Sequence, residues 1–112
     1  MRHHEETLAA FADDLRSDDG VLAVIVTGSV ARGTERTDSD VDVCVLVDEE
    51  RFREEAARDG LSYVRHEPAT YDGGYVDVKV ISPLYLERAA TAADQATRAS
   101  FLGARVDRKS VV

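Results

Sequence analysis

Two short segments of this 112-residue chain carry the residue types that chemistry on phosphates requires. Gly28 and Ser29 follow the apolar run Val21 to Thr27, and Asp40 and Asp42 stand one residue apart at the start of another apolar run. Because glycine has no Cβ, phosphates can approach its backbone closely, and the N–H groups and hydroxyl that follow can bind them. Two carboxylates on one strand face can converge on Mg²⁺, which takes oxygen ligands. The pattern predicts metal-assisted handling of a triphosphate.

A third carboxylate completes this predicted metal site. Asp77 is the only acidic residue in the apolar run from Tyr75 to Ile81, where an adjacent strand can bring it beside Asp40 and Asp42. Two Mg²⁺ ions about 3.5–4 Å apart neutralise a triphosphate and hold an acceptor in line with the α-phosphorus. We therefore predict that the three aspartates bind two Mg²⁺ ions, and that Asp77 also acts as general base for an acceptor hydroxyl.

Four residues are candidates for contact with the triphosphate. The Gly28-Ser29 turn offers backbone N–H groups and a hydroxyl, as described above. Arg32 stands about one helical turn further on, and Lys79 shares a strand face with Asp77. Either cation can pair with a phosphate.

Each of these features also has an ordinary structural explanation when taken alone. Asp40 can cap a loop, Asp42 can lie on a solvated edge, and Asp77 can pair with Lys79 on an exposed face. The conjunction of a strand, a Gly-Ser turn, an Asp-x-Asp pair and a third isolated aspartate favours the functional interpretation. The chain's three histidines have no metal-ligand spacing, and we expect no role for them: His3, His4 and His66.

The predicted elements alternate between helical and extended patterns. Apolar spacing, caps and turn residues predict strands over Val21–Thr27, Asp40–Val47, Leu61–Glu67 and Tyr75–Ile81, and helices over Glu5–Ser17, Glu49–Arg58 and Pro83–Ala93. Asp48 and Ser82 are the predicted N-caps of the second and third helix. A short helical turn over residues 29–32 and a further helical piece over residues 94–102 are also expected.

The length and composition of the chain exclude several classes of protein. The length suits one domain, and the net charge of −8 argues against a surface that binds duplex nucleic acid. Cys44 is the only cysteine, so neither an internal disulfide nor a cysteine-based zinc site can form. The longest apolar run, Val21 to Val26, is far shorter than the roughly 20 residues of a membrane span, and the first residues do not resemble a secretion signal. We expect a cytoplasmic protein.

These motifs resemble those of the DNA polymerase β-type nucleotidyltransferase superfamily, in particular its minimal nucleotidyltransferase branch. The resemblance rests on Gly28 to Thr34, on Ser39-Asp40-Val41-Asp42-Val43 and on Tyr75-Val76-Asp77-Val78-Lys79, and it covers about Leu8 to Val106. It implies an α/β (α+β) fold like the polymerase β palm, with a mixed sheet of about four strands flanked by helices. It also implies an NTP donor, two Mg²⁺ ions bound by the three aspartates, and an NMP product bonded to a hydroxyl acceptor, either a small molecule or a protein.

The resemblance also shapes what we expect of the C-terminal end. We predict one nucleotidyltransferase domain over residues 1–106, followed by a disordered or altered tail over residues 107–112. Members of the superfamily often continue into a helical second domain that shapes the acceptor pocket. We therefore expect a C-terminus truncated before such a domain, and a homodimer or another protein partner that completes the pocket.

Two other classes of protein share parts of this pattern. Gly28-x-x-x-x-Gly33-Thr34 superficially matches a phosphate-binding loop of ATPases, but Thr34 occupies the place of the required lysine, which excludes that class. The serious alternative comes from the resemblance itself, which also implies that a small chain of this branch can be an antitoxin-type binding module that pairs with a helical toxin and either modifies it with AMP or covers it. The three aspartates favour catalysis over binding alone.

Overall fold

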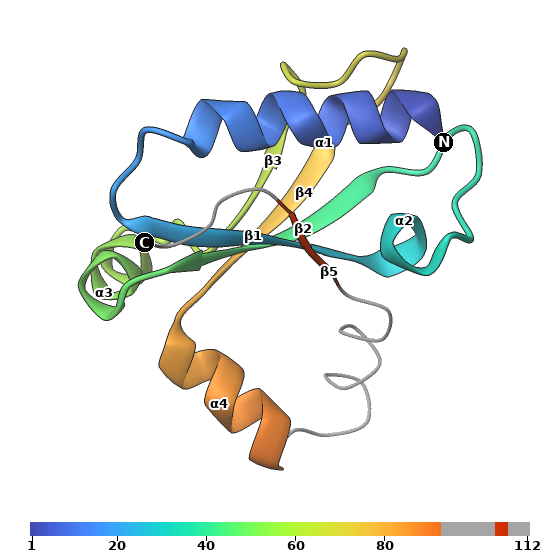
Figure 1. Cartoon of the computed structure of the whole chain (residues 1–112). Helices are drawn as coiled ribbons and strands as arrows, with labels where there is room; N and C mark the ends of the chain where they lie inside the picture. The colour runs from blue at the N-terminus through green and yellow to red at the C-terminus, as the bar shows by residue number, and fades with distance from the viewer. Residues whose placement is uncertain (93–104, 108–112) are drawn as a thin grey trace.

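The computed structural model describes residues 1–92 and 105–107 of the chain (Figure 1). The helices and strands follow one another in the order α1 (Arg2–Leu15), β1 (Val21–Thr27), α2 (Gly28–Arg32), β2 (Val41–Val47), α3 (Glu49–Ala57), β3 (Ser62–Arg65), β4 (Val76–Ile81), α4 (Pro83–Ala92) and β5 (Arg105–Asp107). The predicted helices and strands are present with small shifts of their ends. The predicted helical piece over residues 94–102 and the end of the predicted tail, residues 108–112, lie outside the described residues.

The strands form one mixed sheet in the order β3-β4-β2-β1-β5. The pair β2 and β4 is parallel, and the other neighbouring pairs are antiparallel. The expected mixed sheet flanked by helices is thus confirmed. The short strand β5 was not predicted, and it pairs with Val24 to Val26 at the β1 edge of the sheet.

Alternation along the strands divides the sheet into two different faces. The valines at odd positions of β2 and at even positions of β4 point to one face, which α1 covers with Leu8, Phe11 and Ala12. Figure 1 shows α1 lying across this face and α4 on the opposite side. The second face carries a smaller apolar cluster made of Ile25, Cys44 and Ile81, with Leu46 and Leu86 packed against it. Asp42, Asp77 and Lys79 belong to the second face, because side chains two residues apart along a strand share a face.

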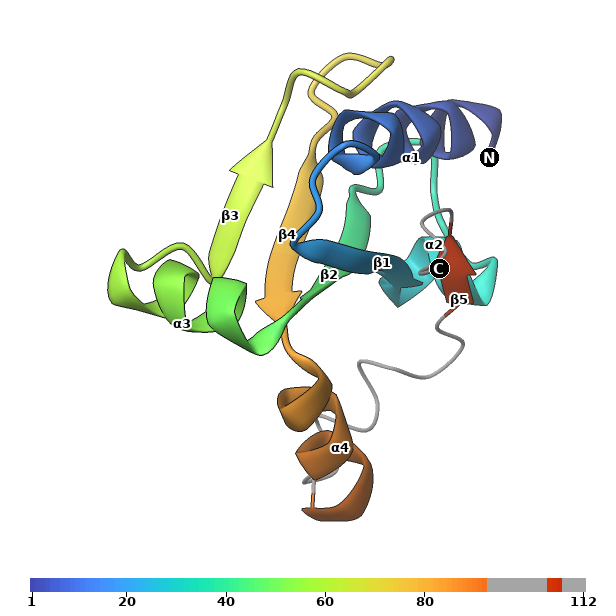
Figure 2. The same cartoon turned by 60° about the vertical axis from the view of Figure 1, so that its left-hand side comes forward.

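Two predicted helix caps hold the elements that follow β2 and β4. The side chain of Asp48 accepts a hydrogen bond of 2.8 Å from the backbone N–H of Arg51, at the start of α3. The hydroxyl of Ser82 accepts one of 3.1 Å from the N–H of Tyr85, at the start of α4. As Figure 2 shows, α4 leaves the end of β4 and extends away from the sheet. Among the described residues no helix has the length and apolar character needed to cross a membrane.

Two leucines, one on α1 and one on α4, can test which helix surface is buried against the sheet. Leu8 on α1 is 1% exposed, whereas Leu84 on α4 is 44% exposed. We expect Leu8→Ala to lower the free energy of unfolding by about 2–5 kcal/mol, because it removes transfer energy and leaves a cavity. The matched change Leu84→Ala is expected to alter it by no more than about 0.5 kcal/mol. Urea unfolding followed by circular dichroism measures both, and equal losses would contradict the described packing of α1.

Candidate functional site

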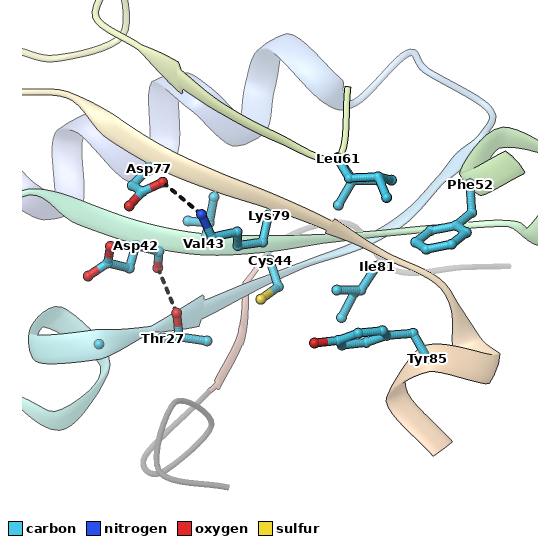
Figure 3. Close-up of a pocket in the computed structure, with 12 residues that line it drawn as sticks. Thr27, Asp42, Val43, Cys44, Phe52, Leu61, Asp77, Lys79, Ile81 and Tyr85 are labelled. Carbon is cyan, nitrogen blue, oxygen red and sulfur yellow. Dashed lines mark hydrogen bonds and ion pairs between the residues drawn. The ribbon is translucent and has the colours of Figure 1, made fainter. Parts of the chain in front are cut away.

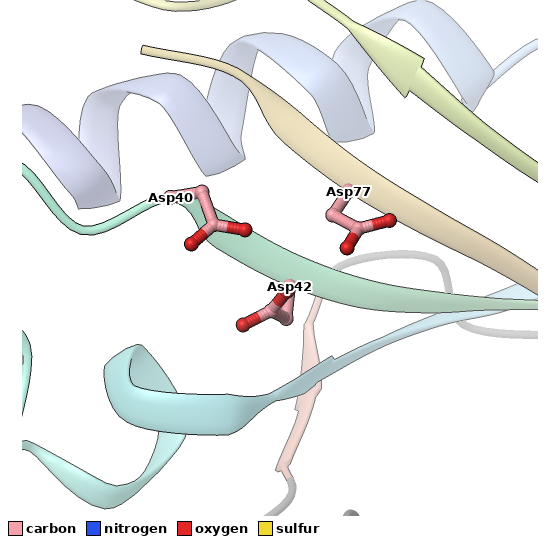
Figure 4. A group of neighbouring side chains, drawn as sticks. All are labelled: Asp40, Asp42 and Asp77. Atoms are coloured by element: carbon pink, nitrogen blue, oxygen red, sulfur yellow. The ribbon is translucent and has the colours of Figure 1, made fainter.

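Three aspartates meet where the inner strands β2 and β4 begin, as shown in Figure 4. Asp42 in β2 and Asp77 in β4 are register partners across the parallel strand pair, so their side chains leave the sheet side by side. Asp40 lies immediately before β2. One carboxylate oxygen from each residue lies within 4.8 Å of those of the other two, and all three side chains are half-buried. The structure therefore brings together the three residues that the sequence singled out.

The negative charges of these three carboxylates repel one another, and their partial burial makes the charged forms less favourable. Burial, followed by the charge and hydrogen bond of Asp40 and the charge of Asp77, raises the pKa of Asp42 from 3.8 to about 7, while Lys79 opposes the rise. A bound divalent cation would remove this cost, because it attracts the charged form of every carboxylate around it. An all-oxygen donor set suits Mg²⁺ or Mn²⁺ and not a soft metal that prefers sulfur. The residues fit such an ion.

The Gly28 turn lies against the same carboxylates. Thr27, the last residue of β1, is the register partner of Asp42, and Gly28 follows it with a φ of +69°. A Cβ added at Gly28 would stand 2.4 Å from Oδ2 of Asp42. Only glycine tolerates both this backbone conformation and this close approach. Ser29, half-buried, comes next in α2, so the predicted phosphate-binding turn and the three aspartates adjoin each other.

The two predicted cationic contacts differ in their surroundings. Nζ of Lys79 lies 3.7 Å from Oδ1 of Asp77 and donates a hydrogen bond of 2.7 Å to the hydroxyl of Ser62 on β3. Lys79 therefore stands at the carboxylates, on the side of β4 away from Gly28. Arg32 is the last residue of α2, and its side chain is exposed.

A cavity of about 480 Å³ extends from the carboxylates along the second face (Figure 3). Its polar end is formed by Thr27, Gly28, Asp42, Asp77 and Lys79. The rest of its lining is mostly apolar: Cys44 and Ile81 of the second face, Tyr85 of α4, and Val43, Phe52, Leu61 and Val80, which belong to the valine core or pack against it. Burial raises the pKa of the Cys44 thiol to about 11, so the thiol stays neutral and contributes apolar surface. The cavity thus joins a charged site to a space for an uncharged organic group.

Sequence reasoning missed two residues beside the site. His4, for which no role was predicted, is fully buried on α1, and its Nε2 lies 2.7 Å from the carbonyl oxygen of Ser39. The hydroxyl of Tyr71 donates a hydrogen bond of 2.7 Å to the same oxygen. One signal was available for His4: it precedes Leu8 and Phe11 by four and seven residues, the spacing of the buried face of a helix.

The chain matches a known protein family. The model of a nucleotidyltransferase domain family matches residues 8–102, well over half of the chain. The matched segment includes the Gly28 turn and all three aspartates. A comparison with curated proteins finds no match.

The close approach of Gly28 to Asp42 can be tested against a second glycine. Gly33 also has a positive φ, of +71°, but a Cβ there would meet nothing within 4 Å. We expect Gly28→Ala and Gly33→Ala both to lose about 1–2 kcal/mol of stability through backbone strain. Only Gly28→Ala should also weaken Mn²⁺ binding, since its methyl group displaces the Asp42 carboxylate. Urea unfolding and isothermal titration calorimetry with Mn²⁺ separate the two effects, and equal Mn²⁺ affinities would contradict the contact.

The raised pKa of Asp42 predicts how stability depends on pH. Because the folded-state pKa of about 7 lies above 3.8, the protonated side chain stabilises the fold at low pH, and this stabilisation is lost as the pH rises through about 7. In EDTA, we expect the free energy of unfolding of Asp42→Asn to exceed that of the wild type by more at about pH 8 than at about pH 5. Added Mg²⁺ should reduce this difference by stabilising the wild type more than the variant. If the difference in free energy of unfolding between the two proteins stays constant with pH, the pKa of Asp42 is not raised.

Proposed function

Since this chain belongs to the nucleotidyltransferase domain family, we propose that it is a Mg²⁺-dependent enzyme that transfers an NMP group from an NTP to a hydroxyl acceptor. The observation that carries this proposal is the convergence of three carboxylates, with oxygens within 4.8 Å of one another, beside a glycine turn. The acceptor is a small molecule or a protein. The cavity that begins at these carboxylates supports the proposal, because it leaves room for an organic substrate.

Asp40, Asp42 and Asp77 are the proposed ligands of two Mg²⁺ ions. When bound, these ions neutralise the triphosphate and orient the reacting groups. The protein's own contribution is to hold the carboxylates at one place before substrate arrives. Asp42 and Asp77 are fixed by the strand pairing, and the half-buried site limits competition from water.

The donor triphosphate is proposed to lie across the Gly28 turn. The absence of a Cβ at Gly28 lets a phosphate come close to the backbone, and Ser29 offers a hydroxyl donor. Arg32 and Lys79 are the proposed cationic contacts. Lys79 reaches the phosphates by exchanging its contact with Ser62 for one with the substrate.

The transfer itself requires one bond to form and one to break. The oxygen of the acceptor hydroxyl attacks the α-phosphorus, and the bond between that phosphorus and the oxygen bridging to the β-phosphate breaks. Pyrophosphate leaves with the electron pair, and the hydroxyl proton passes to a carboxylate oxygen of Asp77. Asp77 suits this role because its carboxylate lies with those of Asp40 and Asp42, at the polar end of the cavity.

The apolar part of the cavity is proposed to hold the nucleoside of the donor. The rings of Phe52 and Tyr85 lie in its lining and offer flat apolar surfaces of the kind on which nucleobases stack. No charged side chain other than Lys79 and the two aspartates lines the cavity among the described residues.

The antitoxin alternative makes use of the same site if the partner is modified with AMP. It differs in its acceptor, which would be a hydroxyl on a helical protein. The three converging carboxylates favour transfer over simple covering of a partner, because covering requires no metal site. A homodimer or another protein partner that completes the acceptor pocket remains part of the proposal.

The proposed activity can be tested with labelled ATP, GTP, CTP and UTP, Mg²⁺, and a panel of small hydroxyl compounds and proteins as acceptors. We expect release of pyrophosphate together with label on an acceptor. Asp42→Asn should lower the rate by at least about 100-fold, because it removes a charged ligand. The matched control is Asp48→Asn, which keeps a good helix cap and should leave the rate unchanged. Wild-type turnover by Asp42→Asn would refute the catalytic assignment.

A second variant tests the role of Asp77. If Asp77 takes the proton in the transition state, Asp77→Ala should lower kcat by about 100-fold or more and change the dissociation constant of the NTP much less. Single-turnover kinetics and equilibrium binding of a labelled NTP separate the two quantities. Equal losses in both would make Asp77 a ligand only.

A further inference from the structure

The three aspartates are not held in the same way. Asp42 and Asp77 lie inside paired strands, where the hydrogen bonds of the ladder fix the backbone on both sides. Asp40 stands before β2 begins, at the end of the loop that follows α2 (Figure 4). A loop residue has more backbone freedom than a strand residue, and losing one metal ligand of three would weaken the site strongly. Something other than the ladder must therefore hold Asp40.

The carbonyl group directly before Asp40 receives two short side-chain hydrogen bonds. Nε2 of His4 and the hydroxyl of Tyr71 each lie 2.7 Å from the carbonyl oxygen of Ser39. Because a carbonyl oxygen only accepts, His4 must carry its proton on Nε2. Burial and the nearby charge of Asp40 raise the pKa of Tyr71, so its hydroxyl keeps its proton and donates. Both lone pairs of this carbonyl oxygen thus have a donor.

These two donors come from elements far from Asp40 in the sequence. His4 lies on α1, and Tyr71 lies on the segment between β3 and β4. Their rings meet edge to face, with centroids 5.1 Å apart and an interplanar angle of 70°. A Cβ at Gly74 would stand 2.6 Å from the Tyr71 ring, so glycine is needed there for the ring to keep this place. His4 itself is 0% exposed and cannot move without disturbing the packing of α1.

Fixing this carbonyl restricts Asp40 directly. The Ser39 carbonyl belongs to the same planar peptide unit as the backbone nitrogen of Asp40. Holding its oxygen from two directions prevents that plane from rotating, and so limits the φ angle from which the Asp40 side chain projects. On the other side, the N–H of Val41 donates to the carbonyl of Tyr75 across 3.2 Å. Asp40 is therefore anchored before and after, although it lies outside the strand.

We propose that His4 and Tyr71 are positioning residues, which hold the Ser39 carbonyl so that the Asp40 carboxylate stays with Asp42 and Asp77 and the site binds its divalent cations tightly. The inference rests on the proposed function, because it assigns Asp40 to metal binding. It adds a means by which the packing of α1 determines the affinity of the site for metal.

The test measures Mn²⁺ binding to the whole chain by isothermal titration calorimetry, without nucleotide. Tyr71→Phe removes one hydrogen bond and keeps the ring, so we expect about three- to tenfold weaker binding. Tyr63→Phe makes the same chemical change at a half-buried tyrosine on β3 that packs against the main core, and it should stay within about twofold of the wild type. His4→Gln keeps an N–H donor and should bind Mn²⁺ more tightly than His4→Leu.

A double-mutant cycle shows whether Tyr71 acts through Asp40. In an Asp40→Asn background, Tyr71→Phe should change the Mn²⁺ affinity no further, because the ligand that it positions is already lost. Thermal unfolding in EDTA gives the purely structural cost of each variant. If Tyr71→Phe lowers the melting temperature and binds Mn²⁺ like the wild type, the contacts serve stability alone and the inference is overturned while the proposed function stands. If the wild type itself takes up no Mn²⁺, the proposed function fails and the inference fails with it.

Discussion

The parallel pairing of β2 with β4 is the constraint on which the site depends. It sets Asp42 opposite Asp77 in register, although the two stand 35 positions apart in the sequence. The register is held from the other face of the sheet, where Val41, Val43 and Val45 pair with Val76, Val78 and Val80 in the main core. A slip of one residue would turn the valines towards the second face and bury the carboxylates in the main core. The free energy of such an arrangement would be far too high for the fold to adopt it. The hydrophobic core thus fixes the geometry of the acidic cluster.

This arrangement places stability and function in opposition at a few positions. Three half-buried carboxylates repel one another, and Gly28 adopts a backbone conformation that other residues resist. Burial of apolar side chains on the valine face and on α1, which contain most of them, offsets this loss of stability. In the proposed function the repulsion between the carboxylates favours metal binding, because a cation that relieves it binds more strongly than one that meets a single carboxylate.

Local patterns in the sequence predicted most elements, and long-range pairing explains what they missed. Alternating valines identified β2 and β4 and put Asp42 and Asp77 on apolar strands, while Asp48 and Ser82 marked helix starts. The order of strands and the parallel register follow from contacts between distant segments, which no local pattern encodes. For the same reason β5, a three-residue strand that exists only by pairing with β1, had no signal of its own. The contact of Lys79 with Ser62 likewise needs β3 beside β4.

His4 shows how a residue without a chemical motif becomes important through the helix that carries it. Its spacing did not suit a metal ligand and no role was predicted for it, whereas the structure places it on the buried face of α1 with Leu8 and Phe11. These apolar contacts fix the helix on the sheet and, with it, the donor that holds the Ser39 carbonyl. A change in the packing of α1 therefore reaches Asp40 through one hydrogen bond and one peptide plane. Asp42 and Asp77 are held by their own ladder, so in the proposed site Asp40 is the ligand that depends on the contact of its preceding carbonyl with α1.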